Sequence, residues 1–191
     1  MQNFEPFTTQ LNLKTGNIQP AAKVIRRRLS DMCNFYFDEE TRRRIEKEEG
    51  DRLVYEVFVT HVPEEEGHVL YGITVIYPGF VGDEFHMTKG HFHNLRDRAE
   101  VYMGITGIGY LILQTEGGAV RSLKMEKGTI AYVPPYWAHR TVNTGEKPFV
   151  FFAAWPGEAG HDYGTIEESG FAKIAVFRDD QVLFVDNPKY K

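Results

Sequence analysis

The sequence predicts an all-β protein of one domain, built as a sandwich or a barrel. Aromatic residues make up 14% of the 191 residues, with ten Tyr and fourteen Phe, and together with Val, Ile and Thr they favour strands over helices. From residue 53 onward, short apolar runs of strand length alternate with Gly, Pro or charged turns. No repeat of about 20 to 50 residues and no linker divides the chain, which is long enough to bury its own core.

Residues 1–52 are expected to form an N-terminal extension that packs onto the β core. Residues 1–22 contain extended segments broken by two prolines and a glycine. Residues 38–50 (DEETRRRIEKEEG) form the one helix that the sequence indicates, because acidic residues begin it, basic residues lie within it and Gly50 can end it. Few of its residues are apolar, so we expect a surface helix.

Three consecutive arginines, Arg26, Arg27 and Arg28, allow two interpretations. They can bind a phosphate group, or they can belong to a solvated or salt-bridged edge strand. Neighbouring residues of a strand point to opposite faces, so the three cannot all converge on one anion. The sequence favours the edge strand.

The core is expected to span residues 53–191, including the C-terminal tail. Six apolar, β-branched or aromatic runs are its predicted strands, and each is bounded by turn residues. These runs are 53–60, 69–78, 99–107, 109–115, 129–135 and 148–156. A further strand is expected over residues 140–145 (RTVNTG), after a Pro-Pro turn.

The charge and composition argue against several classes of partner. A formal net charge of −5 and a pI near 5.8 speak against nucleic acid or an anionic membrane, both of which need a basic protein surface. Neither a run of about 18 apolar residues nor a signal-type segment is visible. The single cysteine, Cys33, excludes an intramolecular disulfide and suits a reducing compartment, so a cytoplasmic location is expected.

Two histidines one residue apart, His91 and His93, suggest a metal site. Alternate side chains of a strand share a face, so both imidazoles can point into one cavity while the residue between them points away. A hairpin through residues 94–98 can bring Glu100 opposite them, and His139 supplies a fourth candidate ligand. A lone histidine is more often hydrogen-bonded in the core or on the surface, but this combination favours metal binding.

Imidazoles and a carboxylate suit divalent iron, nickel, manganese or zinc. Four protein ligands leave one or two positions on an octahedral ion for substrate or water, whereas zinc tends to be four-coordinate. Because a chain of this length folds without a structural metal, we expect the ion to have a functional role.

Two segments resemble the paired motifs of the cupin superfamily. The first contains Gly90, His91, His93, Glu100 and Gly107, and the second, GTIAYVPPYWAHRTVN, contains Gly128, Pro134, His139 and Asn143. The spacing from His93 to Glu100 is longer than cupins usually have, and Tyr136 stands where the second motif normally has glycine. The resemblance implies a cupin-type double-stranded β-helix, which is a jelly-roll barrel.

Longer strings resemble the cupin-type phosphoglucose isomerases known from archaea, from RRLSDM at residues 27–32 through the C-terminus. These strings are TKGHFH, DRAEVY, LQTEGG, PPYWAHRTVN, GHDYGTI and VDNPKYK. That family has the longer His-to-Glu spacing. The resemblance implies interconversion of glucose 6-phosphate and fructose 6-phosphate, in glycolysis and gluconeogenesis, by a homodimer with one divalent metal ion per subunit, usually Fe(2+). The metal ligands it implies are His91, His93, Glu100 and His139.

Glu100 has two possible roles, metal ligand and proton-transferring base, and in this family an enediol route competes with a metal-steered hydride shift. A carboxylate displaced from the ion by the sugar would lie within reach of C2, so our working hypothesis is proton transfer by Glu100. By the same resemblance Tyr55, Tyr102, Tyr136 and His161 face the sugar or shuttle protons. Strand packing is the alternative for each tyrosine. His161 lies in a loop-like stretch, from which it can promote ring opening or donate a proton.

A phosphate group needs donors near the metal. The Thr88 hydroxyl and the Gly90 amide lie just before the first histidine and can form a small anion cradle. Family similarity adds Thr74 and Tyr163. Lys89 is less favoured, because as an alternate neighbour it is expected to face away.

The remaining histidines and tryptophans match no ligand pattern. Surface or turn positions are expected for His61, His68 and His86. The barrel interior or a subunit contact is expected for Trp137, Trp155 and residues 149–152.

Two rival functions remain open. A metal-dependent cupin dioxygenase is one, because three histidines and a glutamate around iron also suit dioxygen chemistry; it predicts an apolar pocket and oxygen consumption. A non-catalytic sugar-binding cupin is the other, and it predicts binding without turnover. Thr74, Thr88 and Tyr163 favour the isomerase, which requires polar contacts with a phosphorylated sugar.

Overall fold

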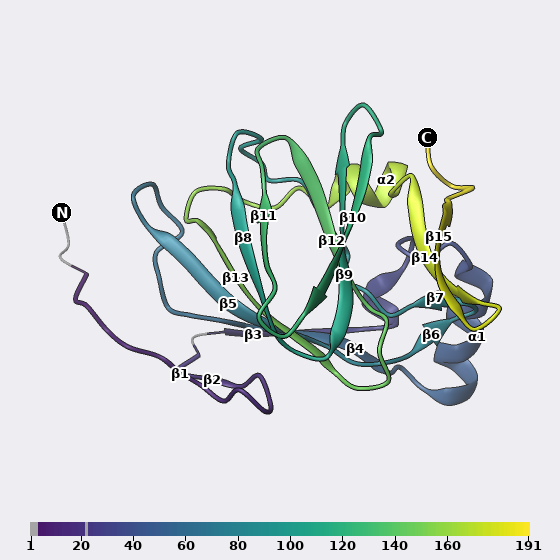
Figure 1. The fold of residues 1–191 in the computed structure, drawn as a ribbon, viewed down its shortest axis with the longest axis horizontal. Coiled ribbons are helices and arrows are strands. Elements are labelled where there is room, and N and C mark those ends of the chain that lie inside the picture. The colour runs from purple at the N-terminus through teal and green to yellow at the C-terminus, as the bar shows by residue number, and fades with distance from the viewer. Residues whose placement is uncertain (1–3, 22) are drawn as a thin grey trace.

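Two antiparallel sheets face each other around a cavity in the computed structural model, which describes residues 4–21 and 23–191 (Figure 1). The prediction of an all-β, cupin-type barrel is confirmed. The larger sheet has the strand order β11-β8-β13-β5-β4-β3. In that order its strands are Ile130–Val133, Glu100–Thr106, Phe149–Pro156, Val69–Ile76, Leu53–Val59 and Lys23–Arg28.

Three smaller sheets complete the fold. The sheet that faces the larger one has the order β10-β9-β12, with strands Val120–Glu126, Ile108–Thr115 and Trp137–Asn143. A sheet at one end of the barrel has the order β15-β14-β7-β6, with strands Gln181–Asp186, Lys173–Arg178, Glu84–Phe85 and Phe80–Val81. A hairpin near the N-terminus consists of β1 (Gln10–Leu11) and β2 (Ile18–Gln19).

Several elements go beyond those that the sequence predicts. They are β6, β7, β10, β14, β15, the short helix α2 (Gly164–Ser169) and the 3-10 turn η1 (Ser30–Met32). The strand β10 (VRSLKME) is mostly exposed and carries only one fully buried residue, Met125, so it lacks the apolar run that marks a core strand. The prediction of a single helix is therefore wrong by one six-residue element.

The larger sheet separates the cavity from an outer apolar layer. Cross-strand rows such as Val57–Thr74–Phe151 and Val59–Gly72–Ala153–Tyr102 lie on its cavity face. The alternate residues Ile73, Val75, Ile105 and Val150 form the outer layer, where Leu11 and Ile18 of the N-terminal hairpin pack against them. The side-chain period of two in β-strands thus gives this sheet an inner face of mixed polar and apolar side chains and an apolar outer face.

The predicted helix is α1 (Glu39–Glu49), and its ends explain its position. Asp38 accepts a hydrogen bond from the Thr41 amide at 2.9 Å, and Gly50 ends the helix with a φ of 95°. Although the helix is polar, Arg42 is buried and donates to the Leu29 carbonyl at 2.8 Å, which fixes the helix to the chain that follows β3.

The three arginines lie on β3, at the edge of the larger sheet, as the sequence favours. Arg26 pairs with Glu56 at 2.8 Å, and Arg28 donates to the Asp51 carbonyl at 2.7 Å. Arg27 has the opposite orientation and lines the cavity. The interpretation of the whole run as a solvated or salt-bridged edge is therefore wrong for its middle residue.

His86 is buried, which contradicts its predicted surface or turn position. Its Nδ1 donates to the Tyr77 carbonyl at 3.1 Å, and a Cβ at Gly79 would lie 2.4 Å from its ring. Burial lowers the pKa of His86 to about 4, so the ring is neutral at physiological pH. The glycine leaves space for the imidazole against the backbone, a contact between chain segments that no local pattern reveals.

Glu84 of β7 is buried, and its pKa is raised to about 7 chiefly because burial penalises the charged carboxylate. It accepts a hydrogen bond from the Phe37 amide at 2.9 Å, and the positive charges of Arg140 and Lys189 offset only part of the burial. An unfolded glutamate loses its proton near pH 4.3. Between about pH 4.5 and 7 the unfolded chain therefore holds fewer protons at this residue, and the free energy of unfolding falls as pH rises.

We expect the Glu84→Gln variant to lack this loss, because an amide does not ionise. Urea unfolding of both proteins at pH 5 and pH 8 measures the change in the free energy of unfolding. Relative to the variant, the wild-type protein should lose up to about 3 kcal/mol between the two pH values. Equal changes in both proteins would contradict the assignment.

Within the described residues, no helix combines the length and the apolar composition that crossing a membrane requires.

Candidate active site

A cavity of about 300 Å³ opens between the two facing sheets. Strands β3, β4, β5, β13 and β8 supply most of its wall, and the segment from Thr88 to His91, residue His139 and the loop that carries His161 and Tyr163 complete it. Both charged and polar side chains reach it.

His91 and His139 lie on neighbouring antiparallel segments. Their backbones exchange hydrogen bonds of 3.2 and 3.0 Å, which holds the two imidazoles side by side. Gly90 precedes them with a φ of 73°, and a Cβ there would lie 2.7 Å from Phe171 and 2.9 Å from the Arg140 Cβ. Only glycine suits this left-handed and crowded position.

His93 and Glu100 are joined by the longer loop. The segment that holds the paired histidines forms isolated bridges rather than a full strand, yet Phe92 still points to the opposite side and is buried. Glu100 begins β8, as expected. The His93 Nδ1 donates to the Arg98 carbonyl at 3.0 Å, so this loop also orients the ring and leaves Nε2 free for a ligand.

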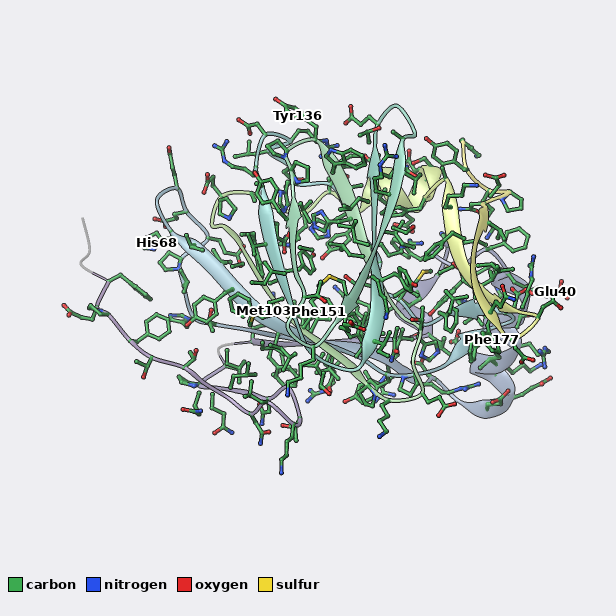
Figure 2. The ribbon with its side chains drawn as sticks, in the orientation of Figure 1. Glu40, His68, Met103, Tyr136, Phe151 and Phe177 are labelled. Atoms are coloured by element: carbon green, nitrogen blue, oxygen red, sulfur yellow. The ribbon has the colours of Figure 1, made fainter. Side chains whose placement is uncertain are left out.

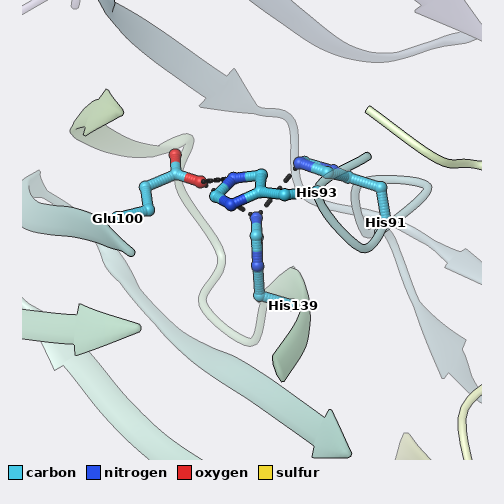
Figure 3. Close-up of side chains that lie close together, drawn as sticks. All are labelled: His91, His93, Glu100 and His139. Atoms are coloured by element: carbon cyan, nitrogen blue, oxygen red, sulfur yellow. Dashed lines mark hydrogen bonds and ion pairs between the residues drawn. The ribbon is translucent and has the colours of Figure 1, made fainter. Parts of the chain in front are cut away.

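Three imidazoles and one carboxylate converge in this cavity (Figure 3). Glu100 Oε2 lies 3.0 Å from His139 Nε2 and 3.2 Å from His93 Nε2, and the His91 and His139 Nε2 atoms lie 3.1 Å apart. All four candidate ligand atoms lie within 4.8 Å of one another. Two ligands about 2.1 Å from one ion, at angles of about 90° to 110°, are about 3.0 to 3.4 Å apart, so the donor set fits a single divalent ion.

The electrostatics of the cluster also suit a cation. Burial and the neighbouring imidazoles lower the pKa of His91 well below its usual value, which keeps a ring nitrogen free of protons. Burial acts to raise the pKa of Glu100, but His139 and His93 outweigh it and lower the pKa to about 2. An ionised carboxylate and neutral imidazoles are the protonation states that metal ligation requires.

Residues 26–191 match the family model described as Glucose-6-phosphate isomerase (GPI). The chain belongs to the glucose-6-phosphate isomerase (GPI) family. A glucose-6-phosphate isomerase of Thermococcus litoralis is 53% identical over 191 residues and covers 100% of both chains. One of Pyrococcus horikoshii is 52% identical over 98% of each chain, and one of Sinorhizobium medicae is 35% identical over 98% of this chain and 89% of its own. The resemblance to this family and the isomerase prediction are thereby confirmed.

Solved structures outside the GPI family overlap with part of the chain. An oxalate decarboxylase of Lactobacillus farciminis aligns with a TM-score of 0.45 and 16% identity, over 57% of this chain and 30% of its own.

Most of the other predicted site residues of this GPI-family chain reach the same cavity. Its lining includes Tyr55, Thr74, Thr88, Gly90, Tyr102, His161 and Tyr163. Tyr55, Thr74 and Tyr102 are buried in the wall, whereas His161 and Tyr163 are only partly covered at the mouth, with their rings stacked at 5.8 Å. The His161 ring lies 4.5 Å from that of His91.

Tyr136 does not join them. Its side chain is 61% exposed and points outward at the upper edge of the molecule (Figure 2), and it is not part of the cavity lining. Its backbone is left-handed, with a φ of 70°, which is the conformation that favours glycine at this point of the cupin motif. The amide donates to the Arg96 carbonyl at 2.6 Å, so the residue contributes through its backbone turn.

Several residues of the cavity lining were not proposed as site residues from the sequence, and three of them bear on its chemistry. Lys89 lines the cavity, which contradicts the prediction that it faces away, because the segment before His91 is not a regular strand. Arg27 reaches the cavity through the alternation of β3, the signal that could have identified it. Trp155, expected in the barrel interior or a subunit contact, lines the cavity inside the barrel, with its ring 5.9 Å from that of His161.

An ion-pair network ties the two loops at the mouth of the site. Arg96 donates to the His93 carbonyl and to Asp162, the latter at 2.6 Å, and its guanidinium lies 4.6 Å from the Phe92 ring centroid. Asp162 in turn accepts from the Thr165 hydroxyl at 2.7 Å. The loop after His93 and the loop of His161 are therefore held together as one wall.

Proposed function

We propose that this cavity is the active site of a metal-dependent isomerase that interconverts glucose 6-phosphate and fructose 6-phosphate. The observation that carries the proposal is the convergence of His91, His93, Glu100 and His139 in a cavity whose wall includes hydroxyl groups and positive charges. Full-length identity to proteins named glucose-6-phosphate isomerase supplies the substrate pair.

His91, His93, Glu100 and His139 are the proposed ligands of one divalent ion. When bound, the ion supplies Lewis-acid chemistry: it polarises the substrate carbonyl and stabilises negative charge on the neighbouring oxygens. We propose Fe(2+) as the native ion, and nickel, manganese and zinc also suit three imidazoles and a carboxylate.

Glu100 is the proposed base that moves a proton between C2 and C1 through an enediol. The histidine contacts that lower its pKa to about 2 also make it a weak base, so the sugar must displace the carboxylate from them before it accepts the proton. Tyr102 lines the cavity together with Glu100, and burial raises the pKa of its hydroxyl well above the usual value, so the hydroxyl keeps its proton. Tyr102 is therefore the proposed hydrogen-bond donor to this carboxylate.

His161 is the proposed group for ring opening. It lies at the cavity mouth beside His91 and Tyr163, and burial lowers its pKa, so the neutral ring can accept a proton from the anomeric hydroxyl. Tyr136 has no part in this scheme, because its ring is directed away from the cavity.

Thr74, Thr88, Gly90, Tyr55 and Tyr163 are the proposed contacts to the sugar and its phosphate. The Thr88 hydroxyl oxygen accepts the Thr141 amide at 3.0 Å, which leaves its O–H group free to donate to an anion. Tyr55 and Tyr163 add hydroxyl groups along the same wall.

A coupled assay tests the function. Fructose 6-phosphate is added to the purified protein, and the glucose 6-phosphate formed is followed through a dehydrogenase, with and without a chelator. We expect turnover that the chelator abolishes. Oxygen consumption without isomerisation would favour the dioxygenase, and binding without turnover would favour the sugar-binding cupin.

The assembly and location are proposed by family resemblance. We propose one cupin domain per chain, a homodimer and a cytoplasmic location. The edge strand β11 exposes Ile130 and Tyr132, and Val101 of the adjacent strand lies across from Tyr132, which supports an apolar contact surface for a second copy.

A further inference from the structure

We infer that Arg27 binds the phosphate group of the substrate and makes the cavity selective for phosphorylated sugars. The inference rests on the isomerase function proposed above and names a residue beyond the phosphate contacts of that proposal. It depends on the position of Arg27 in the cavity wall, opposite Tyr55 on the neighbouring strand and in the same lining as Tyr163 and Lys89.

The register of the edge strand directs Arg27 inward. Arg27 is the cross-strand partner of Tyr55, so the two side chains share the cavity face of the sheet. Its neighbours Arg26 and Arg28 point away and have partners, in Glu56 and the Asp51 carbonyl. The alternation of side chains along β3 thus places one of the three guanidinium groups, that of Arg27, in the site.

Arg27 has no salt bridge to any residue within the described ranges, whereas Arg26, Arg42 and Arg96 each pair with a carboxylate at 2.6 to 2.8 Å. The protein carries more acidic than basic residues, with 27 Asp and Glu against 22 Lys and Arg. A half-buried guanidinium that faces a cavity without a counter-ion is therefore available to an anionic ligand.

Lys89 adds a second positive charge in the same cavity. Its Nζ lies 4.7 Å from the Phe35 ring centroid, and within 4–21 and 23–191 it too forms no salt bridge. Lys89 and Arg27 both belong to the lining of this cavity. Two cations that repel each other in one cavity are stabilised when a phosphate dianion binds between or beside them.

The neutral donors here cannot provide the same selectivity. The hydroxyls of Thr88, Tyr55 and Tyr163 can donate to a sugar hydroxyl as well as to a phosphate. Tyr55 is the cross-strand partner of Arg27, and Tyr163 lines the same cavity, so the guanidinium shares this space with both tyrosines. A guanidinium can donate two parallel hydrogen bonds to a phosphate and carries a full positive charge. Its contribution to the binding of a sugar therefore depends on whether that sugar carries a phosphate.

Three variants test this role in the full-length, metal-loaded protein. Arg27→Gln removes the charge, Arg27→Lys keeps it without the two-pronged geometry, and Arg121→Gln is a matched control on the exposed part of β10, where Arg121 donates only to its own neighbour's carbonyl. The measurements are kcat and KM for fructose 6-phosphate, and the affinity for inorganic phosphate by calorimetry. Thermal unfolding checks that each variant folds.

For Arg27→Gln we expect KM to rise about 10- to 100-fold, with kcat within about threefold, because a charge-assisted bond to the unreacting phosphate is lost. The affinity for inorganic phosphate should fall in parallel. Arg27→Lys should recover part of both, and Arg121→Gln should match the wild type. The inference is overturned if Arg27→Gln changes neither KM nor phosphate affinity by more than about twofold.

The same measurements separate this inference from the proposed function. If the wild-type protein fails to isomerise fructose 6-phosphate, the function fails, and the calorimetric comparison still decides whether Arg27 binds phosphate. If the wild type isomerises the sugar and Arg27→Gln equals it in both measurements, only the role of Arg27 fails.

Discussion

Replacing Glu100 with glutamine should lower kcat for fructose 6-phosphate by about 10²- to 10⁴-fold while KM changes little, because general base catalysis typically contributes this much. Glutamine is close in size to glutamate and keeps an oxygen that can face the three imidazoles, so the variant should still fold and hold metal. The loss then reports the proton transfer. A kcat within about tenfold of the wild-type value would exclude Glu100 as the base.

Two controls sharpen this result. Glu40→Gln makes the same chemical change on the exposed face of α1 and should leave kcat unaltered (Figure 2). The metal content of each purified variant shows whether Glu100→Gln lost activity by losing the ion instead. Wild-type reaction in deuterated water completes the test: an enediol route places solvent deuterium in the product, and its absence even at low conversion would favour a direct hydride shift.

Replacing His139 with alanine should reduce activity more than about 100-fold and reduce the metal content well below one ion per chain. Changes to residues that only support a metal ligand already cost about 10- to 100-fold in metal affinity or activity, so loss of a ligand should cost more. His139 is buried, and its Nε2 lies 3.1 Å from the His91 Nε2 and 3.0 Å from the Glu100 carboxylate, so its loss removes one of the four converging ligand atoms.

The control for this variant is His61→Ala, because His61 is exposed and lies outside the cavity lining. Metal analysis and activity are measured on both. If His139→Ala fails to fold, treating the wild type with a chelator and then restoring divalent iron or manganese should remove and return activity. Full metal content together with wild-type activity in folded His139→Ala would contradict the proposed ligand set.

The sequence predicts the position of the histidine–glutamate cluster because its geometry is largely local. Alternation places His91 and His93 on one side, a hairpin brings Glu100 back, and the strand after the Pro-Pro turn carries His139. The apolar runs likewise predict the strands of the larger sheet, because each has a buried face that needs a period of two.

Other features depend on contacts between distant segments. The burial of His86 follows from its approach to Gly79, and the cavity position of Lys89 follows from the irregular backbone at Gly90. The outward direction of Tyr136 follows from a left-handed turn. A reading of local patterns cannot recover these, because neighbours in the chain do not determine them.

The strand order of the larger sheet has a consequence for how the molecule is assembled during synthesis. The strand β13 lies between β5 and β8, so these earlier strands are joined only through a segment made much later. When the last histidine of the cluster has left the ribosome, the strand that closes the pocket has not yet emerged. Productive folding must therefore wait until residues 149–156 leave the ribosome, and topologies with such distant pairings form slowly.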